Sequence, residues 1–404
     1  MRRRLQATDF KMISVSDALL LIDQHRPDFG AETVSVNDAF GRVTAKDIFA
    51  GLDMPPFKSS SMDGYAVQAC KLGETLRLIG EASAGIPFGS DVEAGEAVKI
   101  STGAIAPNGT DRILRKEQAV LKDSWVTVRR APRADAFIRP RASDFPKGKL
   151  LVSKGERLNP AHLTLCAAAN HATVDVKRKP KVALMSSGNE LRALGSDILH
   201  GEIFSANAVG LKAALEAWGA DVTDLGIVRD DEAEIREKLK QLQGFDIVIP
   251  IGGASVGDHD LLRPAFRAAG YDSLFESVAM KPGKPCWMMR KASQIILGLP
   301  GNPASTFVGA HVFLRPLLGL PNVFTTVVLA EALDENGPRE TYLRATISNR
   351  DGVMMAAPYP VQDSYRLLPQ ATSNSLLRIP AMGGPYKVGQ KIQALNLHGR
   401  GCFW

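Results

Sequence analysis

Four loops rich in Gly, Ser and Asp follow apolar segments in the middle of the chain. They lie at 186–190, 229–231, 252–260 and 300–305. In an open parallel sheet, ligands bind beyond the carboxyl ends of the strands, so loops that follow the strands meet at one edge. The composition of any one loop does not distinguish it from an ordinary turn, because turns use the same residue types. Their recurrence indicates a ligand site at this edge.

The 252–260 loop carries residue types that suit an anion. Gly252, Gly253 and Gly257 let the backbone approach a ligand closely and adopt a positive φ. Ser255 and exposed backbone N–H groups can donate hydrogen bonds to phosphate oxygens, and the start of a helix favours negative charge. We therefore expect this loop to bind a phosphate-bearing ligand.

Carboxylates in the same loops could hold a metal ion. Glu190, Asp230 and Asp260 offer hard oxygen atoms, and Mg²⁺ beside a phosphorylated ligand is held by few protein ligands and several waters. Asp230 and Asp260 could instead cap the helices that follow them, although capping does not exclude a metal role.

The segment from Lys281 to Pro285 is a stiff basic turn. Its sequence is Lys-Pro-Gly-Lys-Pro, so two prolines restrict the backbone and two lysines lie three residues apart. Two cations on a rigid turn suit an oxyanion or a phosphate. The alternative is a solvated basic turn without a ligand.

Two further turns lie nearer the N-terminus. The 59–67 segment contains three serines followed by Met62, Asp63 and Gly64, and the 95–104 segment ends in a turn with Thr102. Both could present hydroxyl and carboxylate groups, and both could be simple hairpin turns.

Several reaction classes are disfavoured. No His is placed for Ser-His-Asp catalysis, since only His259 lies in one of the rich loops. The chain has neither a G-x-G-x-x-G motif nor a P-loop lysine. Nucleophilic catalysis, NAD chemistry and P-loop ATP hydrolysis are therefore not expected.

The elements that position these loops follow a β-α-β rhythm between about 179 and 322. Predicted strands lie at 181–185, 222–228, 246–251 and 294–299, and predicted helices at 206–218, at 231–242, from 261 and from 303. This alternation predicts a doubly wound parallel sheet with right-handed crossovers.

The flanking regions have a different character. Residues 51–144 contain recurrent Gly and Pro between short strand-like pieces at 76–79, 97–100 and 125–128, which predicts a small all-β module. Residues 323–404 return to a β pattern and predict a C-terminal barrel-like domain. Residues 1–50 and 145–178 form a mixed linker or dimerisation domain. We thus expect a multidomain α/β plus β protein.

Composition limits the partners. The 404 residues include 49 Lys plus Arg and 43 Asp plus Glu, a net charge of +6. This mild excess, without basic stripes or interleaved aromatics, fits an anionic small ligand better than nucleic acid. No apolar stretch reaches the roughly 18 residues of a membrane span. Four widely spaced cysteines favour free thiols and a cytoplasmic setting.

Taken together, these segments resemble the molybdopterin molybdenumtransferase family, which includes MoeA and the gephyrin E domain. The matching stretches occur in family order and cover nearly the whole chain: 56–67, 95–109, 181–191, 252–260, 281–285 and 298–305. The resemblance implies Mg²⁺-dependent insertion of molybdate into adenylylated molybdopterin with release of AMP. It also implies a homodimer with four subdomains per subunit and the site at the dimer cleft. A molybdopterin adenylyltransferase and a client molybdoenzyme are further implied partners.

The resemblance also implies roles for particular residues. Those expected to act in catalysis are Asp63, Thr102, Asp144, Glu190, Asp230 and Asp260, of which Glu190, Asp230 and Asp260 would also hold the metal. Those expected to bind substrate are Gly188, Gly252, Gly253, Ser255, Gly257, Lys281, Lys284, Asn302, Ser305, Arg344 and Ser364. Arg344 and Ser364 would contact the oxyanion.

The chain departs from the family pattern at several positions. Lys58 and Ser59 replace the usual Asp-Asn, and Ser61 replaces an Ala. Asn189 stands where the family has Asp, and Ser277 stands where it has Lys. Loss of a charged hydrogen bond at position 277 would weaken anion binding by about 1–3 kcal/mol. These departures leave open a divergent paralogue with an altered rate or a dedicated target enzyme.

Three functions follow as hypotheses. The first is the molybdate-inserting enzyme, favoured by Glu190, Asp260 and the two lysines. The second is a carrier that holds the pterin or the finished cofactor for a molybdoenzyme, favoured by Asn189 and Ser277. A gephyrin-like scaffold has little support, because the chain shows no long linker or extra domain.

Overall fold

The computed structural model of this protein describes residues 12–253 and 261–397. The chain divides into two compact units. Unit 1 contains the residues up to Gly30 and those from Arg178 onward, and unit 2 contains Ala31–Lys177. Three predicted site residues, Ser255, Gly257 and Asp260, lie outside the described residues.

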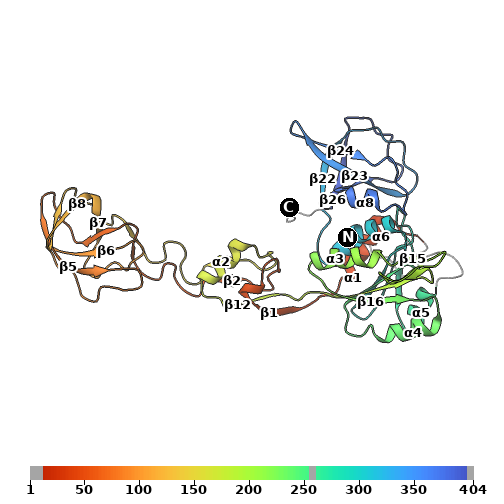
Figure 1. Cartoon of the computed structure of the whole chain (residues 1–404), viewed down its shortest axis with the longest axis horizontal. Coiled ribbons are helices and arrows are strands. Elements are labelled where there is room, and N and C mark those ends of the chain that lie inside the picture. Colours follow the sequence, from red (N-terminus) through yellow and green to blue (C-terminus); the bar gives the residue numbers. More distant parts are fainter. Residues whose placement is uncertain (1–11, 254–260, 398–404) are drawn as a thin grey trace, which may run out of the picture. The chain divides into compact units, whose positions relative to one another are not determined.

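Unit 1 is built on a sheet with the strand order β16-β13-β17-β21-β20-β18 (Figure 1). Its strands are β13 (Lys181–Ser187), β16 (Asp221–Val228), β17 (Ile247–Ile251), β18 (Asp272–Phe275), β20 (Trp287–Lys291) and β21 (Gln294–Gly298). β13 pairs in parallel with β16 and β17, and β17 pairs in parallel with β21. The chain runs from β13 to β16 on one side and then back past β13 to β17 on the other, so the strand order reverses here. Such sheets bind ligands at this switch point.

Helices cover both faces of this sheet. They are α1 (Val15–His25), α3 (Asn207–Ala217) and α6 (Pro303–Gly309) on one face, and α4 (Glu232–Lys240) and α5 (Leu262–Ala268) on the other. Val182 and Leu184 of β13 join the first core, while Ala183 and Met185 join the second. Alternate side chains of a strand point to opposite faces, so a strand buried on both sides needs an unbroken apolar run.

One edge of the sheet differs from the parallel arrangement expected from the sequence. β20 runs antiparallel to β21 and to β18, so the sheet is mixed. Only Ala292 and Ser293 separate β20 from β21. Two residues suffice for a hairpin but not for the crossover that parallel strands require.

The C-terminal domain is a closed barrel, as predicted. Its strands are β22 (Phe324–Leu329), β23 (Glu340–Arg350), β24 (Val353–Pro358), β25 (Ser375–Ile379) and β26 (Lys391–Asn396). They pair in the order β23-β24-β22-β26-β25, and β25 returns to pair with β23. Closure removes the exposed edges of the sheet. A short strand of the α/β domain, β19 (Met280–Lys281), adds to β23 in parallel.

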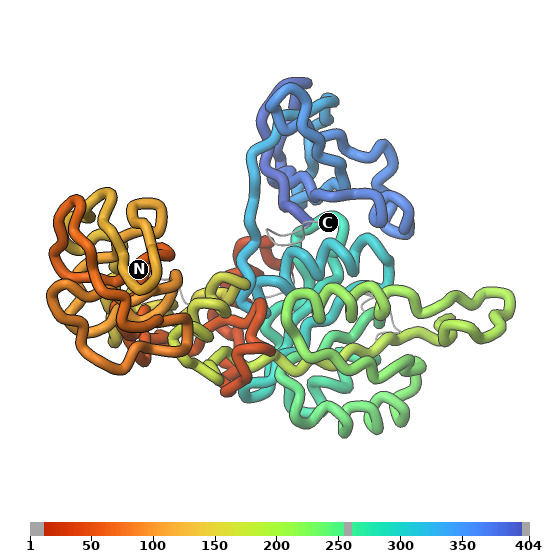
Figure 2. The backbone as a smooth tube through the Cα atoms, turned by 60° about the vertical axis from the view of Figure 1, so that its left-hand side comes forward, coloured from red at the N-terminus to blue at the C-terminus, as the bar shows by residue number. Residues whose placement is uncertain are grey.

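The segment between β13 and α3 projects from the α/β domain (Figure 2). At its base β14 (Leu191–Arg192) pairs in parallel with β15 (Ile203–Phe204), and Arg192 forms an ion pair with Glu202. Large apolar side chains are exposed along this segment: Leu194, Ile198, Leu199, Ile203 and Phe204.

Unit 2 contains two packed parts. The first joins β1 (Ala31–Ser35) to β12 (Thr173–Lys177) and β2 (Ile48–Phe49) to β11 (Leu150–Val152), with α2 (Pro160–Ala168) packed nearby. The second is the predicted all-β module. Its sheet contains β4 (Gly64–Val67), β5 (Thr75–Ala82), β6 (Glu96–Ile100), β7 (Arg112–Arg115), β8 (Ala119–Lys122) and β9 (Trp125–Val128). A smaller pairing joins β3 (Ser59–Ser60) to β10 (Ile138–Arg139).

Residues 1–50 were expected to form one mixed domain with residues 145–178, but the first helix packs elsewhere. Ala18, Leu21 and Ile22 of α1 are buried in the core of the α/β domain together with Phe313 and Leu317. The helix therefore belongs to unit 1, and the chain passes into unit 2 after Gly30. Ser14 caps the helix, because its Oγ accepts a hydrogen bond from the Asp17 N–H.

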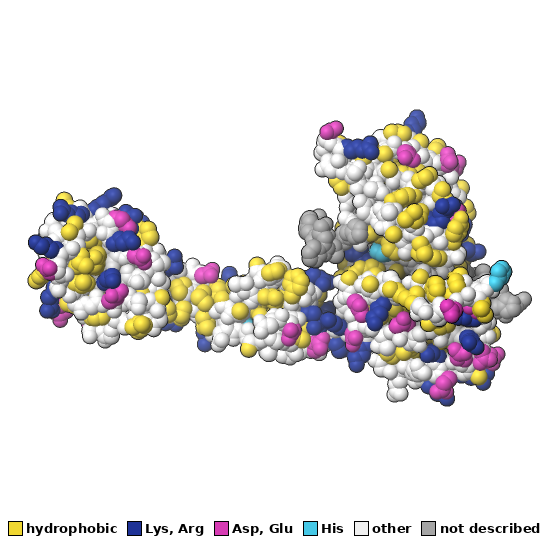
Figure 3. Space-filling view, viewed as in Figure 1, with side chains coloured by type: hydrophobic (Ala, Val, Ile, Leu, Met, Phe, Trp, Pro, Cys, Tyr) yellow, Lys and Arg dark blue, Asp and Glu magenta, His cyan; other side chains and the backbone are white. Residues whose placement is uncertain are grey.

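Leu72, Leu121 and Trp125 are exposed on the β module. Figure 3 shows hydrophobic side chains on the surface of this module among basic and acidic ones. In the described part of the chain, every helix is too short or too polar to cross a membrane.

Candidate functional site

The ends of three parallel strands meet as the loop pattern predicts. Gly252, just after β17, has φ +90°, and a Cβ atom there would lie 2.3 Å from the Ser187 carbonyl oxygen at the end of β13. A Cβ atom on Gly301, in the loop after β21, would lie 3.6 Å from the Gly252 Cα. Only glycine at 252 permits both the positive φ and this approach. The loops after β13, β17 and β21 are thus in contact.

Asp230 faces the end of β13. Its Oδ1 accepts a hydrogen bond from the Ser187 hydroxyl at 2.9 Å, and its N–H donates to the Asn189 Oδ1 at 3.2 Å. The cap of α4 is instead Asp231, whose Oδ1 accepts from the Glu234 N–H at 2.9 Å. Capping therefore does not explain Asp230, and its half-buried carboxylate belongs to the strand-end cluster.

Glu190 lies beside the same cluster. Its carboxylate folds back over Gly188, where a Cβ atom would lie 2.5 Å from Oε2. Glu190 is exposed and Gly188 is buried. Among residues 12–253 and 261–397, no three His, Cys, Asp or Glu side chains come together as a metal site. Glu190 and Asp230 offer oxygen atoms on adjacent loops, which is the sparse donor set that suits Mg²⁺.

The lysine turn, residues 281–285, lies against the start of α6. A Cβ atom on Gly283 would lie 3.8 Å from the Ser305 carbonyl oxygen. The turn is closed by a hydrogen bond from the Val278 N–H to the Lys284 carbonyl at 2.9 Å. Lys281 and Lys284 are exposed, and within the described residues neither ammonium group has an ion-pair partner. Two positive charges are thus held on a closed turn.

The barrel contributes a loop to the same place. The Ser364 carbonyl accepts a hydrogen bond from the Ala304 N–H at 2.9 Å, and its hydroxyl accepts one from the Asn302 Nδ2 at 3.1 Å. Ser305, in the first turn of α6, is buried. Ser364 therefore lies beside Asn302, although the two are 62 residues apart in the sequence, and Ser305 follows Asn302 in the first turn of α6.

Arg344 occupies a different environment from the one expected for an oxyanion ligand. It is 1% exposed. Its guanidinium donates to oxygens of Gln362, Asp363 and Arg366, all in one loop of the barrel. The side chain thus acts within the protein, on the loop that carries Ser364.

Asp63 and Thr102 lie together in unit 2. The Asp63 Oδ1 accepts hydrogen bonds from the Thr102 N–H at 2.8 Å and from its hydroxyl at 2.9 Å. These two bonds, the backbone one first, lower the pKa of Asp63 below its usual value. The turn thus presents an exposed, ionised carboxylate. Asp144 is also exposed, and its N–H donates to the Met54 carbonyl at 3.0 Å.

Three residues of the cluster were missed from the sequence. Ser187 and Gly301 lie inside loops already singled out, but only the fold shows that Ser187 bonds to Asp230 and that Gly301 touches Gly252. Gln362 carries no sequence signal, because nothing near it suggests a partner at Arg344.

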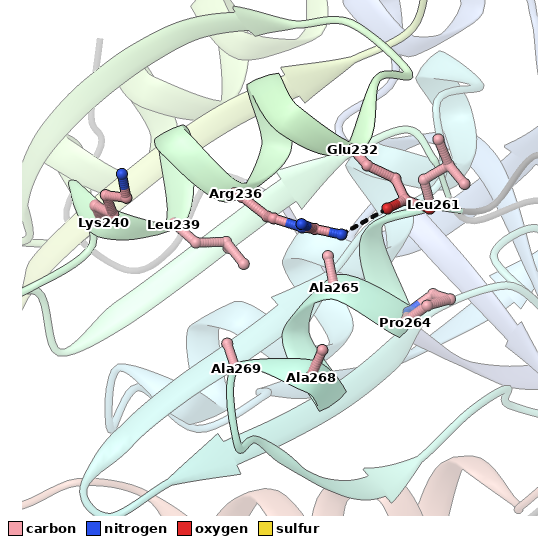
Figure 4. A pocket seen from close by; sticks show the side chains of 9 residues that line it. All are labelled: Glu232, Arg236, Leu239, Lys240, Leu261, Pro264, Ala265, Ala268 and Ala269. Carbon is pink, nitrogen blue, oxygen red and sulfur yellow. Dashed lines mark hydrogen bonds and ion pairs between the residues drawn. The ribbon is translucent and has the colours of Figure 1, made fainter.

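A groove of about 570 Å³ lies elsewhere, between α4 and α5 (Figure 4). Apolar side chains such as Leu239, Leu261 and Ala265 line it, and Arg236 and Glu232, which also line it, form an ion pair along α4. Of the predicted site residues within 12–253 and 261–397, none lines this groove.

Comparison with known proteins places these features in a family. Three family profiles match: "MoeA N-terminal region (domain I and II)" over residues 13–170, "Probable molybdopterin binding domain" over 184–319, and "MoeA C-terminal region (domain IV)" over 326–397. The molybdopterin molybdenumtransferase of Bacillus subtilis is 30% identical over 405 residues, covering 95% of this chain and 94% of that protein. The protein of the same name from Haemophilus influenzae is 35% identical over 291 residues, covering 71% and 72%.

Solved structures agree with this relationship. Two structures of the molybdopterin biosynthesis MoeA protein from Pyrococcus horikoshii each share 25% sequence identity with the chain. Their TM-scores are 0.83 and 0.76, and both cover 96% of this chain.

Proposed function

Because the chain belongs to the molybdopterin molybdenumtransferase family, we propose that it inserts molybdate into adenylylated molybdopterin. Water hydrolyses the phosphoanhydride bond to AMP, and the products are molybdenum cofactor and AMP. The observation that carries this proposal is the cluster in unit 1, where strand-end loops, the lysine turn and the Ser364 loop adjoin the start of α6.

The central physical problem is that both substrates are anions. Molybdate and the diphosphate-linked pterin repel each other when they occupy one site. Lys281 and Lys284 offset this repulsion, because they are fixed on a turn and need little reorganisation when charge develops. The Gly252 N–H already donates to the Leu299 carbonyl at 2.9 Å, so in this loop we assign the contact with a phosphate oxygen to the Gly253 N–H.

Magnesium fits the carboxylates of the strand-end loops. Glu190 and Asp230 would hold the ion, with Asp260 as the third expected ligand, and most of its remaining coordination would be water and phosphate oxygen. When bound, Mg²⁺ offsets the charge of the phosphates and polarises the bond to AMP. Ser187 has a supporting role, since its hydroxyl orients the Asp230 carboxylate.

The same proposal gives a role in the reaction to Asp63 and Thr102 of the β module and to Asp144, which follows it in the chain. Asp63 is ionised at neutral pH, and the bonds from Thr102 lower its pKa further and so stabilise the charged form. An ionised carboxylate of this kind suits orientation of a bound metal or a water rather than donation of a proton.

A carrier is the second candidate function. Asn189 replaces a carboxylate of the family and accepts a hydrogen bond from the Asp230 N–H, so this position lacks one negative charge for a metal. This loss fits a protein that binds the pterin but turns it over slowly. The replacement of a family lysine by Ser277 fits such a protein as well.

One assay separates the two functions. Purified protein is mixed with adenylylated molybdopterin, molybdate and Mg²⁺, and AMP and cofactor are measured. The enzyme releases AMP and forms cofactor in equal amounts. Tight pterin binding without AMP release would establish the carrier and reject the enzyme.

Assembly and location follow as parts of the same proposal. We infer a homodimer, supported by the exposed apolar side chains of the projecting segment, such as Leu194 and Leu199. A molybdopterin adenylyltransferase would supply the substrate and a client molybdoenzyme would receive the product. A cytoplasmic setting is supported by Cys70, Cys166 and Cys286, which are free thiols.

A further inference from the structure

In unit 2, the 141–147 turn carries Asp144 at the surface. Two backbone hydrogen bonds join this turn to an earlier segment, from the Ala142 N–H to the Pro55 carbonyl at 2.9 Å and from the Asp144 N–H to the Met54 carbonyl at 3.0 Å. The exposed Asp144 carboxylate has no hydrogen-bond or ion-pair partner in the part of the chain that the structure describes. The backbone of the turn therefore determines where this carboxylate lies.

The backbone of this turn includes an unfavourable conformation. Ala142 has φ +60°, in the left-handed region that a residue with a Cβ atom rarely adopts. Such a conformation persists only where the surrounding contacts hold it. On one side of Asp144 the contacts come from Phe145, which is buried with Ala50 and Ala169. On the other side the turn needs a different attachment.

Asp53 supplies that attachment and joins the two ends of the turn. Its Oδ2 accepts a hydrogen bond from the Arg141 Nε at 2.6 Å, and its Oδ1 accepts one from the Lys147 N–H at 2.7 Å. The Asp53 side chain is 17% exposed. The bonds from Lys147 and then from Arg141 lower the pKa of Asp53 below its usual value. The turn thus binds the charged form of this carboxyl group.

We propose that Asp53 is a positioning residue, which fixes the 141–147 turn so that Asp144 is held in place for the reaction. The inference rests on the proposed function, in which Asp144 takes part in the reaction. An ion pair with an exposed arginine adds little to global stability, and the Arg141 side chain is 67% exposed. The gain from Asp53 therefore lies in the conformation of one turn.

Glu96 offers a matched control in the same unit. Its carboxylate also accepts one bond from an arginine, Arg77 at 2.7 Å, and one from a backbone N–H, that of Glu93 at 3.1 Å. Its side chain is 17% exposed, like that of Asp53. Asp53→Ala and Glu96→Ala therefore remove the same kinds of bond, but only Asp53 is bonded to the turn that carries Asp144.

The first test measures the turn without any substrate. Asp53→Ala and Arg141→Ala should each speed amide hydrogen exchange at Ala142 and Asp144 by about tenfold, because the turn opens locally when one end is released. Glu96→Ala should leave exchange at these two amides unchanged. Unchanged exchange in both turn variants would overturn the proposal.

The second test measures the reaction. Asp53→Ala should lower kcat for AMP release by about five- to tenfold, a loss near the size of one hydrogen bond, whereas Glu96→Ala should leave kcat unchanged. In the Asp144→Ala background, Asp53→Ala should lower kcat no further, because Asp53 acts through Asp144. Losses that multiply would overturn the proposal. A lowered Tm with the wild-type kcat would overturn it too, since Asp53 would then serve stability alone.

Failure of the proposed function gives a different result. If the wild-type protein releases no AMP from adenylylated molybdopterin, the enzyme is rejected, but exchange at Ala142 and Asp144 still shows whether Asp53 holds the turn. If the wild type releases AMP and Asp53→Ala changes neither exchange nor kcat, the enzyme stands and the positioning role is rejected. The two failures are therefore distinguishable.

Discussion

At the scale of single residues, neighbours with similar chemistry have different tasks. Asp230 bonds to Ser187 across two strand ends, whereas Asp231 caps α4. Asp63 is held by Thr102 in a turn of the β module. Each assignment depends on hydrogen-bond partners that the sequence does not show.

The two adjacent aspartates give a matched pair of variants. Asp230→Ala should lower kcat by about ten- to a hundredfold, as expected when a charged group at the site is lost, with little change in unfolding free energy. Asp231→Ala should lower the unfolding free energy by about 1 kcal/mol through loss of the cap and leave kcat near that of the wild type. Urea unfolding and AMP release measure both effects. Equal effects of the two variants on kcat would contradict this division.

The pH dependence of Asp63 has a definite sign. Its folded pKa is lowered by the Thr102 N–H and hydroxyl. Its contribution to stability is therefore present above its ordinary unfolded pKa and is lost as the pH falls through the folded pKa. Thr102→Val removes only the hydroxyl bond, so the pKa of Asp63 should rise but stay below its ordinary value. Carboxyl NMR titration checks this, and an unchanged pKa would show that the hydroxyl does not matter.

At the scale of elements, the ends of β13, β17 and β21 must approach closely for the loops to form one site. Gly252 permits the close approach of β13 and β17, because its backbone has a positive φ and lies against Ser187. Strand β23 has a comparable task in the barrel, since it pairs with β19 and carries Arg344.

Alanine substitutions at two glycines isolate this close approach. Gly270 has φ +87°, close to that of Gly252, but a Cβ atom there would lie 3.7 Å from the nearest atom. Gly270→Ala should cost about 1–2 kcal/mol for the left-handed backbone alone. Gly252→Ala should cost about 1–3 kcal/mol more, because strand ends must move apart. Calorimetry of both variants measures the difference, and equal losses would show that the strand ends are not in tight contact.

Sequence reasoning identified the loops but not their connections. Apolar runs followed by Gly and Ser predicted the ends of β13, β17 and β21, since these are local patterns. The pairing of Lys281 with Thr341 joins residues sixty apart, and no local signal encodes it. The antiparallel edge was missed because no strand was predicted for β20, whose short apolar run ends in the exposed Arg290 and Lys291. The place of α1 was missed because its apolar face shows that it packs, but not against which core.

At the scale of the whole molecule, the chain has two units joined by two connections. Unit 2 begins and ends on paired neighbours, since Ala31 of β1 lies opposite Lys177 of β12. The Arg178 N–H also donates to the Gly30 carbonyl at 3.1 Å. Unit 2 is therefore inserted into unit 1 at one place.

Removal of the inserted unit tests this organisation. Replacement of residues 31–177 by a short glycine turn should leave unit 1 folded, with a cooperative thermal transition and near-UV circular dichroism. Release of AMP should be lost, because Asp63, Thr102 and Asp144 are removed. A non-cooperative transition would show that unit 1 needs unit 2 to fold. Retained turnover would exclude a catalytic role for those three residues.

The most direct test of the account concerns the lysine turn, which must let two anions share one site. The double variant Lys281→Met/Lys284→Met should raise the KM for molybdate by about tenfold or more, the size expected for a lost charged contact. Its Tm should change little, because both side chains are exposed. The control is Lys387→Met, at an exposed position on the barrel, which should leave the KM unchanged. A double variant with the wild-type KM would contradict the account.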